Sequence, residues 1–308
     1  MKKVIVTGVT GFIGMHLCET LLAKGVSVYG VGRNEAKLQQ LSKNVLFHPI
    51  RLGFEDYYRL DKIIVEKDFD TFFHMAYLGV NGKEKNNYQI QITNTQVSCD
   101  VVKAAKNLEC KRFLFSGSVD EYEAYFNPDD RFVLPSHSRI YGLTKFAAEN
   151  IGKAMSLELG IEYVGVILSL TYGEGNKTNI LPNAVIRKSQ TNEPISLITG
   201  NNYFDMIYIE EAISGILAVA ERGKNLESYF IGHEELRTFR EIVEQMCSIL
   251  NSNSELRFGD YKDPDYIMDF EMIHRDKLFV DTGYKCDFDF SKSLLRTKEW
   301  LLQQAKVL

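Results

Sequence analysis

"VIVTGVTGFIG", residues 4–14, places Gly8, Gly11 and Gly14 directly after an apolar run. That run predicts a short buried strand, and apolar residues at helical spacing over 12–23 predict a helix. On a strand-to-helix turn, one glycine permits the tight turn, one lets a pyrophosphate approach the backbone, and one lets helix and strand pack closely. The free amides and positive dipole end of the helix favour phosphate. Three glycines alone are weak evidence, but their place at the first strand–helix junction favours nucleotide binding.

The composition is that of a globular chain. Its 308 residues are 45% hydrophobic and 25% charged, enough for one large or two small domains. A net charge of -5 gives no general attraction to nucleic acid or to an anionic membrane, so we expect neither as a partner. Five scattered cysteines, without paired short spacing, predict reduced thiols, no bound metal and a cytoplasmic location. We expect no secretory segment and no membrane span.

Strand-like and helical runs alternate through the first half of the chain. This alternation predicts an α/β fold, a Rossmann-type doubly wound parallel sheet covered by helices on both faces, with ligands at the carboxyl ends of its strands. We expect a dinucleotide-binding domain of 1–169 plus about 205–232, and a smaller α/β substrate lobe of 170–204 and 233–308. The expected strands are 4–7, 26–31, 45–48, 71–75, 112–116, 163–168, 195–198, 206–209 and 229–231, and the later helices are 180–190, 210–222 and 239–251.

The end of the second strand bears on the choice of dinucleotide. An acidic residue there hydrogen-bonds the ribose hydroxyls of NAD. This chain instead reads "YGVGRN", with Gly32 and Arg33 at that place. Arg33 suits a 2′-phosphate, so the sequence favours NADP over NAD. An ordinary surface arginine is the alternative, and nearby Glu35 leaves NAD open.

A tyrosine and a lysine four residues apart suggest acid–base chemistry. In "YGLTKFAAEN", Tyr141 and Lys145 project from one face of a helical run. A cation beside a phenol lowers the pKa of the phenol, which makes Tyr141 a candidate general acid or base. Upstream, a strand ends in Ser116-Gly117-Ser118, where a hydroxyl faces the ligand crevice and shares a substrate carbonyl oxygen with Tyr141. An exposed helix pair and loop-starting serines are the plainer alternatives.

Taken together and in this order, the three glycines, Ser118, Tyr141 and Lys145 resemble the extended short-chain dehydrogenase/reductase family, whose members act on nucleotide sugars. Supporting similarities lie in "FFHMAY" (72–77), Asn94, "TYGEG" (171–175) and "FDMIYIEEA" (204–212), so the resemblance covers nearly the whole chain.

The resemblance implies roles for individual residues. Tyr141 is the expected proton donor, Lys145 binds the nicotinamide ribose and tunes Tyr141, and Ser118 hydrogen-bonds the reacting oxygen. Asn94 supports the cofactor site, although a buried asparagine satisfied by the backbone explains it equally well. The other expected cofactor-binding residues are Gly8, Gly11, Phe12, Ile13, Gly14, Arg33 and Ala76.

The expected substrate residues are Asn179, Arg187 and Arg257, of which the arginines suit a diphosphate. Asn179 is also placed to cap the following helix.

Departures from the family pattern narrow the activity. Ser118 is followed by Val119 and Asp120, whereas the family 4,6-dehydratases carry Asp-Glu after their threonine, so we do not expect water elimination. Other departures leave the nucleotide base open or change the residues expected near the cofactor: Leu170, Phe204, Tyr77 and Arg51.

We therefore predict an NADP(H)-dependent reductase of a nucleotide-linked 4-keto sugar, with Tyr141 as proton donor. A nucleotide-sugar 4-epimerase with retained NAD is the alternative, and a non-catalytic nucleotide-binding protein is a third reading. A homodimer formed through the helices at 92–107 and 141–159 is expected, although their apolar positions also fit an ordinary core.

Overall fold

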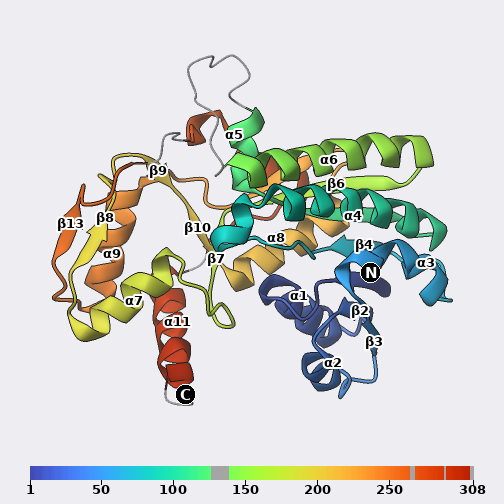
Figure 1. Cartoon of the computed structure of the whole chain (residues 1–308), viewed down its shortest axis with the longest axis horizontal. Helices are drawn as coiled ribbons and strands as arrows, with labels where there is room; N and C mark the ends of the chain where they lie inside the picture. Colours follow the sequence, from blue (N-terminus) through green and yellow to red (C-terminus); the bar gives the residue numbers. More distant parts are fainter. Residues whose placement is uncertain (126–138, 264–267, 288, 306–308) are drawn as a thin grey trace.

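The computed structural model describes residues 1–125, 139–263, 268–287 and 289–305 (Figure 1). Seven strands form its central sheet: β1 (Lys3–Thr7), β2 (Ser27–Gly32), β3 (Phe47–Arg51), β4 (Thr71–His74), β5 (Arg112–Ser118), β6 (Glu162–Leu168) and β11 (Ser228–Ile231). Their order is β11-β6-β5-β4-β1-β2-β3, and every neighbouring pair is parallel. The expected Rossmann-type doubly wound sheet is confirmed.

Helices cover both faces of this sheet because its strands are buried on both sides. In β1, the fully buried Val4 and Val6 pack in one core with Leu17, while Ile5 points to the other face and packs with Val101. The first core takes in α1 (Phe12–Ala23) and α8 (Ile209–Arg222). The second takes in α4 (Tyr88–Asn107) and α6 (Ile140–Leu159), which run side by side (Figure 1). The helices of this part are α1 (Phe12–Ala23), α2 (Glu35–Leu41), α3 (Leu60–Ile63), α4 (Tyr88–Asn107), α5 (Tyr122–Tyr125), α6 (Ile140–Leu159), α8 (Ile209–Arg222) and α10 (Lys277–Thr282).

The second lobe combines three helices with short strand pairs. Its helices are α7 (Leu181–Thr191), α9 (Phe239–Leu250) and α11 (Phe290–Ala305). The pairs are β8 (Ile195–Leu197) with β13 (Leu256–Phe258), β9 (Tyr203–Phe204) with β12 (Arg237–Thr238), and β7 (Leu170–Tyr172) with β10 (Met206–Tyr208). Because β7 and β10 pair across the expected boundary, the division into two domains stays a prediction. The described residues also contain four 3-10 turns: η1 (Phe54–Arg59), η2 (Gly82–Asn86), η3 (Val119–Glu121) and η5 (Phe270–Met272).

The starts of two elements differ from the sequence prediction by two residues or more. β3 begins at Phe47 and not at 45, because Asn44 closes a turn in which its side chain accepts a hydrogen bond from the Leu46 amide at 3.0 Å. Val45 is consequently 90% exposed. α4 begins at Tyr88, four residues before the expected start, because the Asn87 side chain caps its first amides.

Within the described ranges, no helix has the length and apolar character needed to cross a membrane. All five cysteines lie in those ranges, and none is bonded to another.

Candidate active site

The glycine turn joins β1 to α1 and leaves room for a ligand. Gly8 has a φ of +73°, which glycine adopts without strain. A Cβ on Gly14 would lie 2.2 Å from the Gly8 carbonyl oxygen, so only glycine permits this close packing of helix against turn. Gly11 precedes α1 and offers no side chain to cap it, so the first amides of the helix, from Phe12 and Ile13, are available to an anion. These features fit the pyrophosphate of a dinucleotide.

The loop after β4 lies directly behind this turn. The Ala76 amide donates to the Thr7 hydroxyl at 3.3 Å, and Thr7 is hydrogen-bonded to His74 at 3.0 Å. Fully buried Asn94 accepts from the Leu78 amide at 2.9 Å and donates to the Leu78 carbonyl at 2.8 Å. The Asn94 side chain therefore holds the loop in place by binding the loop backbone. This contact agrees with both alternatives, a residue that supports the cofactor site and a buried asparagine satisfied by the backbone.

The residues after β2 bear on the adenosine end of the cofactor. Exposed Arg33 has no ion pair within the described ranges, whereas Glu35 is bound by Arg51 at 2.6 Å. The acid that left NAD open is therefore engaged by a neighbouring guanidinium. Lys37 lies nearby, with its ammonium donating to the Thr10 carbonyl of the glycine turn at 2.8 Å. Sequence reasoning missed Lys37, although its position in the first turns of the helix after Arg33 was a usable signal.

Ser118 and Tyr141 meet, as predicted, at the carboxyl edge of the sheet. The Ser118 hydroxyl lies close enough to the Tyr141 phenol to affect its pKa, and Tyr141 is 6% exposed. Ser118 also donates to the Asp120 carboxylate at 3.0 Å. The Lys85 ammonium, from η2, lies 3.1 Å from this carboxylate and 4.9 Å from the centre of the Tyr141 ring. Lys85 was not anticipated, because only the fold brings η2 next to η3.

The environment of Tyr141 differs from the expectation. Burial and then the Asp120 carboxylate hold the pKa of Tyr141 well above its usual value, although the nearby Ser118 hydroxyl acts in the opposite direction. The Lys145 ammonium instead donates to the Ser116 carbonyl and lies 3.7 Å from the centre of the Tyr77 ring. The expected lowering of the Tyr141 pKa by Lys145 is therefore wrong for this structure, because the ammonium is directed elsewhere. Burial also lowers the pKa of Lys145 to about 8.

Tyr77 accounts for much of this arrangement. The resemblance calls for a small residue here. The half-buried phenol ring of Tyr77 instead fills the space between Tyr141 and Lys145. Its ring meets Tyr141 edge to face at 5.8 Å while stacking on the Lys145 ammonium.

The "TYGEG" turn connects the second lobe to the glycine turn. Its Glu174 carbonyl accepts a hydrogen bond from the His16 ring in α1 at 2.7 Å. The Glu174 carboxylate accepts from the Tyr208 hydroxyl at 2.6 Å and from Arg296 of α11 at 3.0 Å. The first helix, the "TYGEG" turn and the last helix thus form one linked set of contacts.

The substrate residues predicted from the resemblance are only partly grouped. Arg187, within α7, donates to the side chain of Asn179, just before that helix, at 3.2 Å. Ile180 precedes α7 and no side chain caps it, so Asn179 does not act as the cap. Arg257 lies on β13, where its guanidinium binds Glu255 at 2.7 Å. The structure thus pairs Arg187 with Asn179 and engages Arg257 elsewhere.

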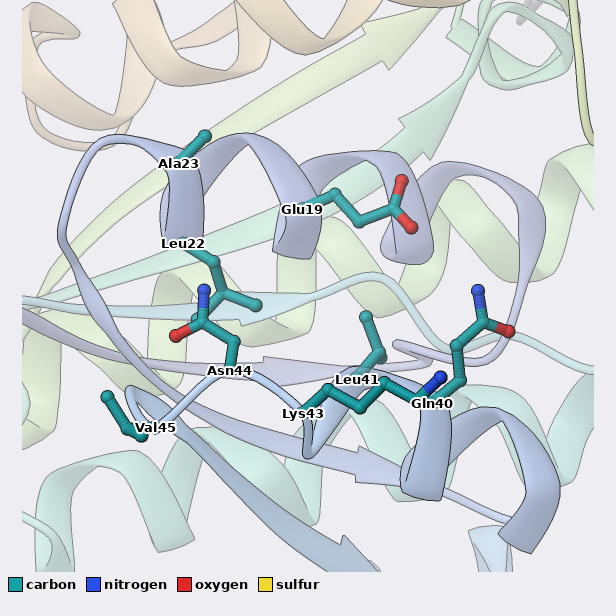
Figure 2. A pocket seen from close by; sticks show the side chains of 8 residues that line it. All are labelled: Glu19, Leu22, Ala23, Gln40, Leu41, Lys43, Asn44 and Val45. Carbon is teal, nitrogen blue, oxygen red and sulfur yellow. The ribbon is translucent and has the colours of Figure 1, made fainter.

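A surface hollow lies away from this site. A cavity of about 620 Å³ lies between the far ends of α1 and α2 (Figure 2). Since the glycine turn lies at the start of α1, this hollow is at the opposite edge of the sheet. It is lined by Glu19, Leu22, Ala23, Gln40, Leu41, Lys43, Asn44 and Val45.

Comparisons with known proteins bear on the family of this chain. CDP-abequose synthase of Salmonella typhimurium is 23% identical, over 95% of this chain and 96% of its own. A protein of Bacillus subtilis named as an uncharacterized UDP-glucose epimerase, YtcB, is 25% identical over 84% of this chain and 85% of its own. The fold matches UDP-glucuronic acid 4-epimerase from Bacillus cereus, solved with UDP-4-deoxy-4-fluoro-glucuronic acid and NAD, with a TM-score of 0.80, 22% identity, and coverage of 98% and 99%. A family model described as the NAD dependent epimerase/dehydratase family matches residues 4–232.

Proposed function

Because the chain belongs to the NAD dependent epimerase/dehydratase family, we propose that it is an NADP(H)-dependent reductase of a nucleotide-linked 4-keto sugar. The observation that carries the proposal is the Ser118 hydroxyl beside the buried Tyr141 phenol. Ser118 ends β5 and Thr7 ends β1, so this pair lies at the same edge of the parallel sheet as the glycine turn.

Reduction of a keto sugar needs a hydride, which the nicotinamide supplies, and a proton, which this chain supplies. Tyr141 is the proton donor to the sugar oxygen, and Ser118 hydrogen-bonds the same oxygen as negative charge develops on it. Since burial and Asp120 raise the Tyr141 pKa, the phenol is protonated at neutral pH. A protonated phenol favours proton donation over the proton abstraction with which an epimerase begins. Lys145 is assigned to the nicotinamide ribose.

Three observations support NADP as the cofactor. Arg33 has no ion pair in the described part of the chain, Lys37 lies against the glycine turn, and Glu35 is engaged by Arg51. An exposed guanidinium beside a lysine suits a 2′-phosphate.

The substrate is proposed to be a nucleoside diphosphate sugar. Arg187, paired with Asn179, is the proposed ligand of its diphosphate, and Arg257 takes part only if it releases Glu255. The relatives named for CDP- and UDP-linked sugars support this class of substrate.

The test supplies purified protein with NADPH and a panel of nucleotide-linked 4-keto sugars, and follows NADPH oxidation. Stoichiometric consumption of NADPH is expected. The similarity to UDP-glucuronic acid 4-epimerase keeps a second function in view, a 4-epimerase that uses the same residues. Tightly retained NAD, with turnover of nucleotide sugars and no need for added cofactor, would establish the epimerase and reject the reductase.

A homodimer is proposed through α4 and α6. These neighbouring helices expose large apolar side chains, which a second copy would cover: Tyr88, Ile92, Leu143, Ile151 and Leu157. Light scattering should report twice the mass of one chain. Replacing both Ile92 and Ile151 with a charged residue should reduce the measured mass to that of a single chain. The cytoplasmic location remains a prediction.

A further inference from the structure

Two carboxylates are buried beneath the active site and hydrogen-bonded to each other. Glu121 of η3 is 3% exposed and Glu149 of α6 is 4% exposed. Glutamates are almost never this deeply buried unless they have partners. Neither takes part in the proton transfer proposed above, so their burial needs another explanation.

The sheet is shaped to hold this pair. A Cβ on Gly117, in β5, would lie 2.5 Å from a Glu121 carboxylate oxygen. A Cβ on Gly165, in neighbouring β6, would lie 2.6 Å from a Glu149 carboxylate oxygen. Glycine weakens a strand, so two glycines at these places indicate that the space is kept for the carboxylates.

Each carboxylate has its own set of partners. Glu121 accepts a hydrogen bond from the Ser118 amide at 2.7 Å, directly at the strand end that presents the Ser118 hydroxyl. Glu149 is bound by the Lys153 ammonium at 2.8 Å and by the Ser228 hydroxyl. Two hydrogen-bonded carboxyl groups in a dry interior cannot both be ionised, so they share one proton.

The proton belongs on Glu121. Burial, and then the charge of Glu149, raise the pKa of Glu121 well above its usual value. Burial also acts to raise the pKa of Glu149, but Lys153 and the hydrogen bonds from Glu121 and Ser228 outweigh it and lower that pKa. The other ionisable groups that face the pair are Tyr77 after β4, Tyr141 and Lys145 on α6, and Tyr163 on β6.

We propose that Glu121 is a protonated positioning residue, which links the Ser118 amide to the Glu149 carboxylate and so fixes Ser118 and α6, with Tyr141 and Lys145, relative to one another. Its effect on turnover rests on the proposed function, whereas its protonation does not. When the pair loses its proton at alkaline pH, a second buried negative charge arises beside Tyr141. That charge opposes formation of a phenolate, so turnover falls.

Infrared spectroscopy of the protein alone tests the protonation. The wild type should show the C=O stretching band of a buried protonated carboxyl group at neutral pH, and Glu121→Gln should lose it. Glu158→Gln, which changes an exposed carboxylate on the same α6, is the matched control and should keep the band. Glu149→Gln removes the repelling charge, so the band should disappear at a lower pH than in the wild type.

Kinetics test the positioning. Gln at position 121 keeps both hydrogen bonds but cannot ionise, so Glu121→Gln should retain turnover and lose the alkaline decline caused by the pair. Glu121→Leu fills the space without either hydrogen bond, and its kcat should fall by about 100-fold with KM for the nucleotide sugar changed by less than about threefold. Circular dichroism establishes that each variant is folded.

The outcomes separate this inference from the proposed function. A band that survives in Glu121→Gln, or a pH profile of that variant that coincides with the wild type, overturns the inference even in an active enzyme. Suppose that the wild type shows the band, Glu121→Gln loses it, and the wild type reduces no nucleotide sugar. That result rejects the proposed function and upholds the protonation of Glu121.

Discussion

Tyr141→Phe separates proton donation from folding, because the structure lets the hydroxyl be removed almost alone. The Ser118 hydroxyl loses the neighbouring phenol oxygen but keeps its hydrogen bond to Asp120 at 3.0 Å. The ring keeps its edge-to-face contact with Tyr77 at 5.8 Å and the Lys85 ammonium at 4.9 Å. No buried partner is left unsatisfied, so the free energy of unfolding should fall by only about 1 kcal/mol.

Turnover should respond far more strongly. A positioned proton donor contributes roughly 10²- to 10⁴-fold to the rate, so kcat of Tyr141→Phe should fall by that factor. The assay follows NADPH oxidation with a nucleotide-linked 4-keto sugar, alongside urea unfolding and cofactor binding, which should be nearly unchanged. Tyr58→Phe, at an exposed tyrosine of η1, is the control and should behave as the wild type. A kcat within tenfold of the wild type would refute the assignment of Tyr141.

Three further predictions concern the cofactor and the core. Arg33→Ala should remove the larger rise in melting temperature that NADP gives over NAD, and an unchanged difference between the two would reject Arg33 as the 2′-phosphate ligand. Gly14→Ala should destabilise the fold by about 1–3 kcal/mol in urea unfolding and weaken cofactor binding, since its Cβ meets the Gly8 carbonyl; undiminished binding would contradict the close-approach argument. Burial, and then the Lys145 charge, lower the pKa of His74 to about 3, so only the unfolded chain takes up the proton below its ordinary pKa. The free energy of unfolding should therefore fall by about 1.4 kcal/mol per pH unit as pH drops from about 6 towards 3, a slope that His74→Gln should lack.

The fold was predictable because its signals are local. Alternate residues of β1 enter different cores, so an unbroken apolar run such as Val4, Ile5 and Val6 indicates a strand buried on both faces. The glycine turn and the meeting of Ser118 with Tyr141 follow from parallel strands, whose carboxyl ends share one edge. Boundaries were less predictable: apolar Val45 suggested strand, but the Asn44 turn leaves it in solvent.

The missed features depend on contacts between distant segments. Tyr77, Lys85 and Asp120 were visible in the sequence, yet nothing local showed that they would surround Tyr141 and turn Lys145 away. Glu121 reads as an ordinary charge after a strand. Its burial depends on space left by glycines in two strands and on a helix that begins 19 residues later, at Ile140. Such interior polar contacts have no periodic pattern from which to predict them.

The contacts of Glu174 have a consequence for how the molecule is assembled. His16 and Glu174 are 158 residues apart in the chain, and Glu174 and Arg296 are 122 apart. During synthesis, the His16 bond cannot form until residue 174 has left the ribosome, and the Arg296 bond must wait for residue 296. Pairings between such distant segments form slowly, because a long loop must first close. The glycine turn should therefore become fully rigid only after these later segments have folded against it.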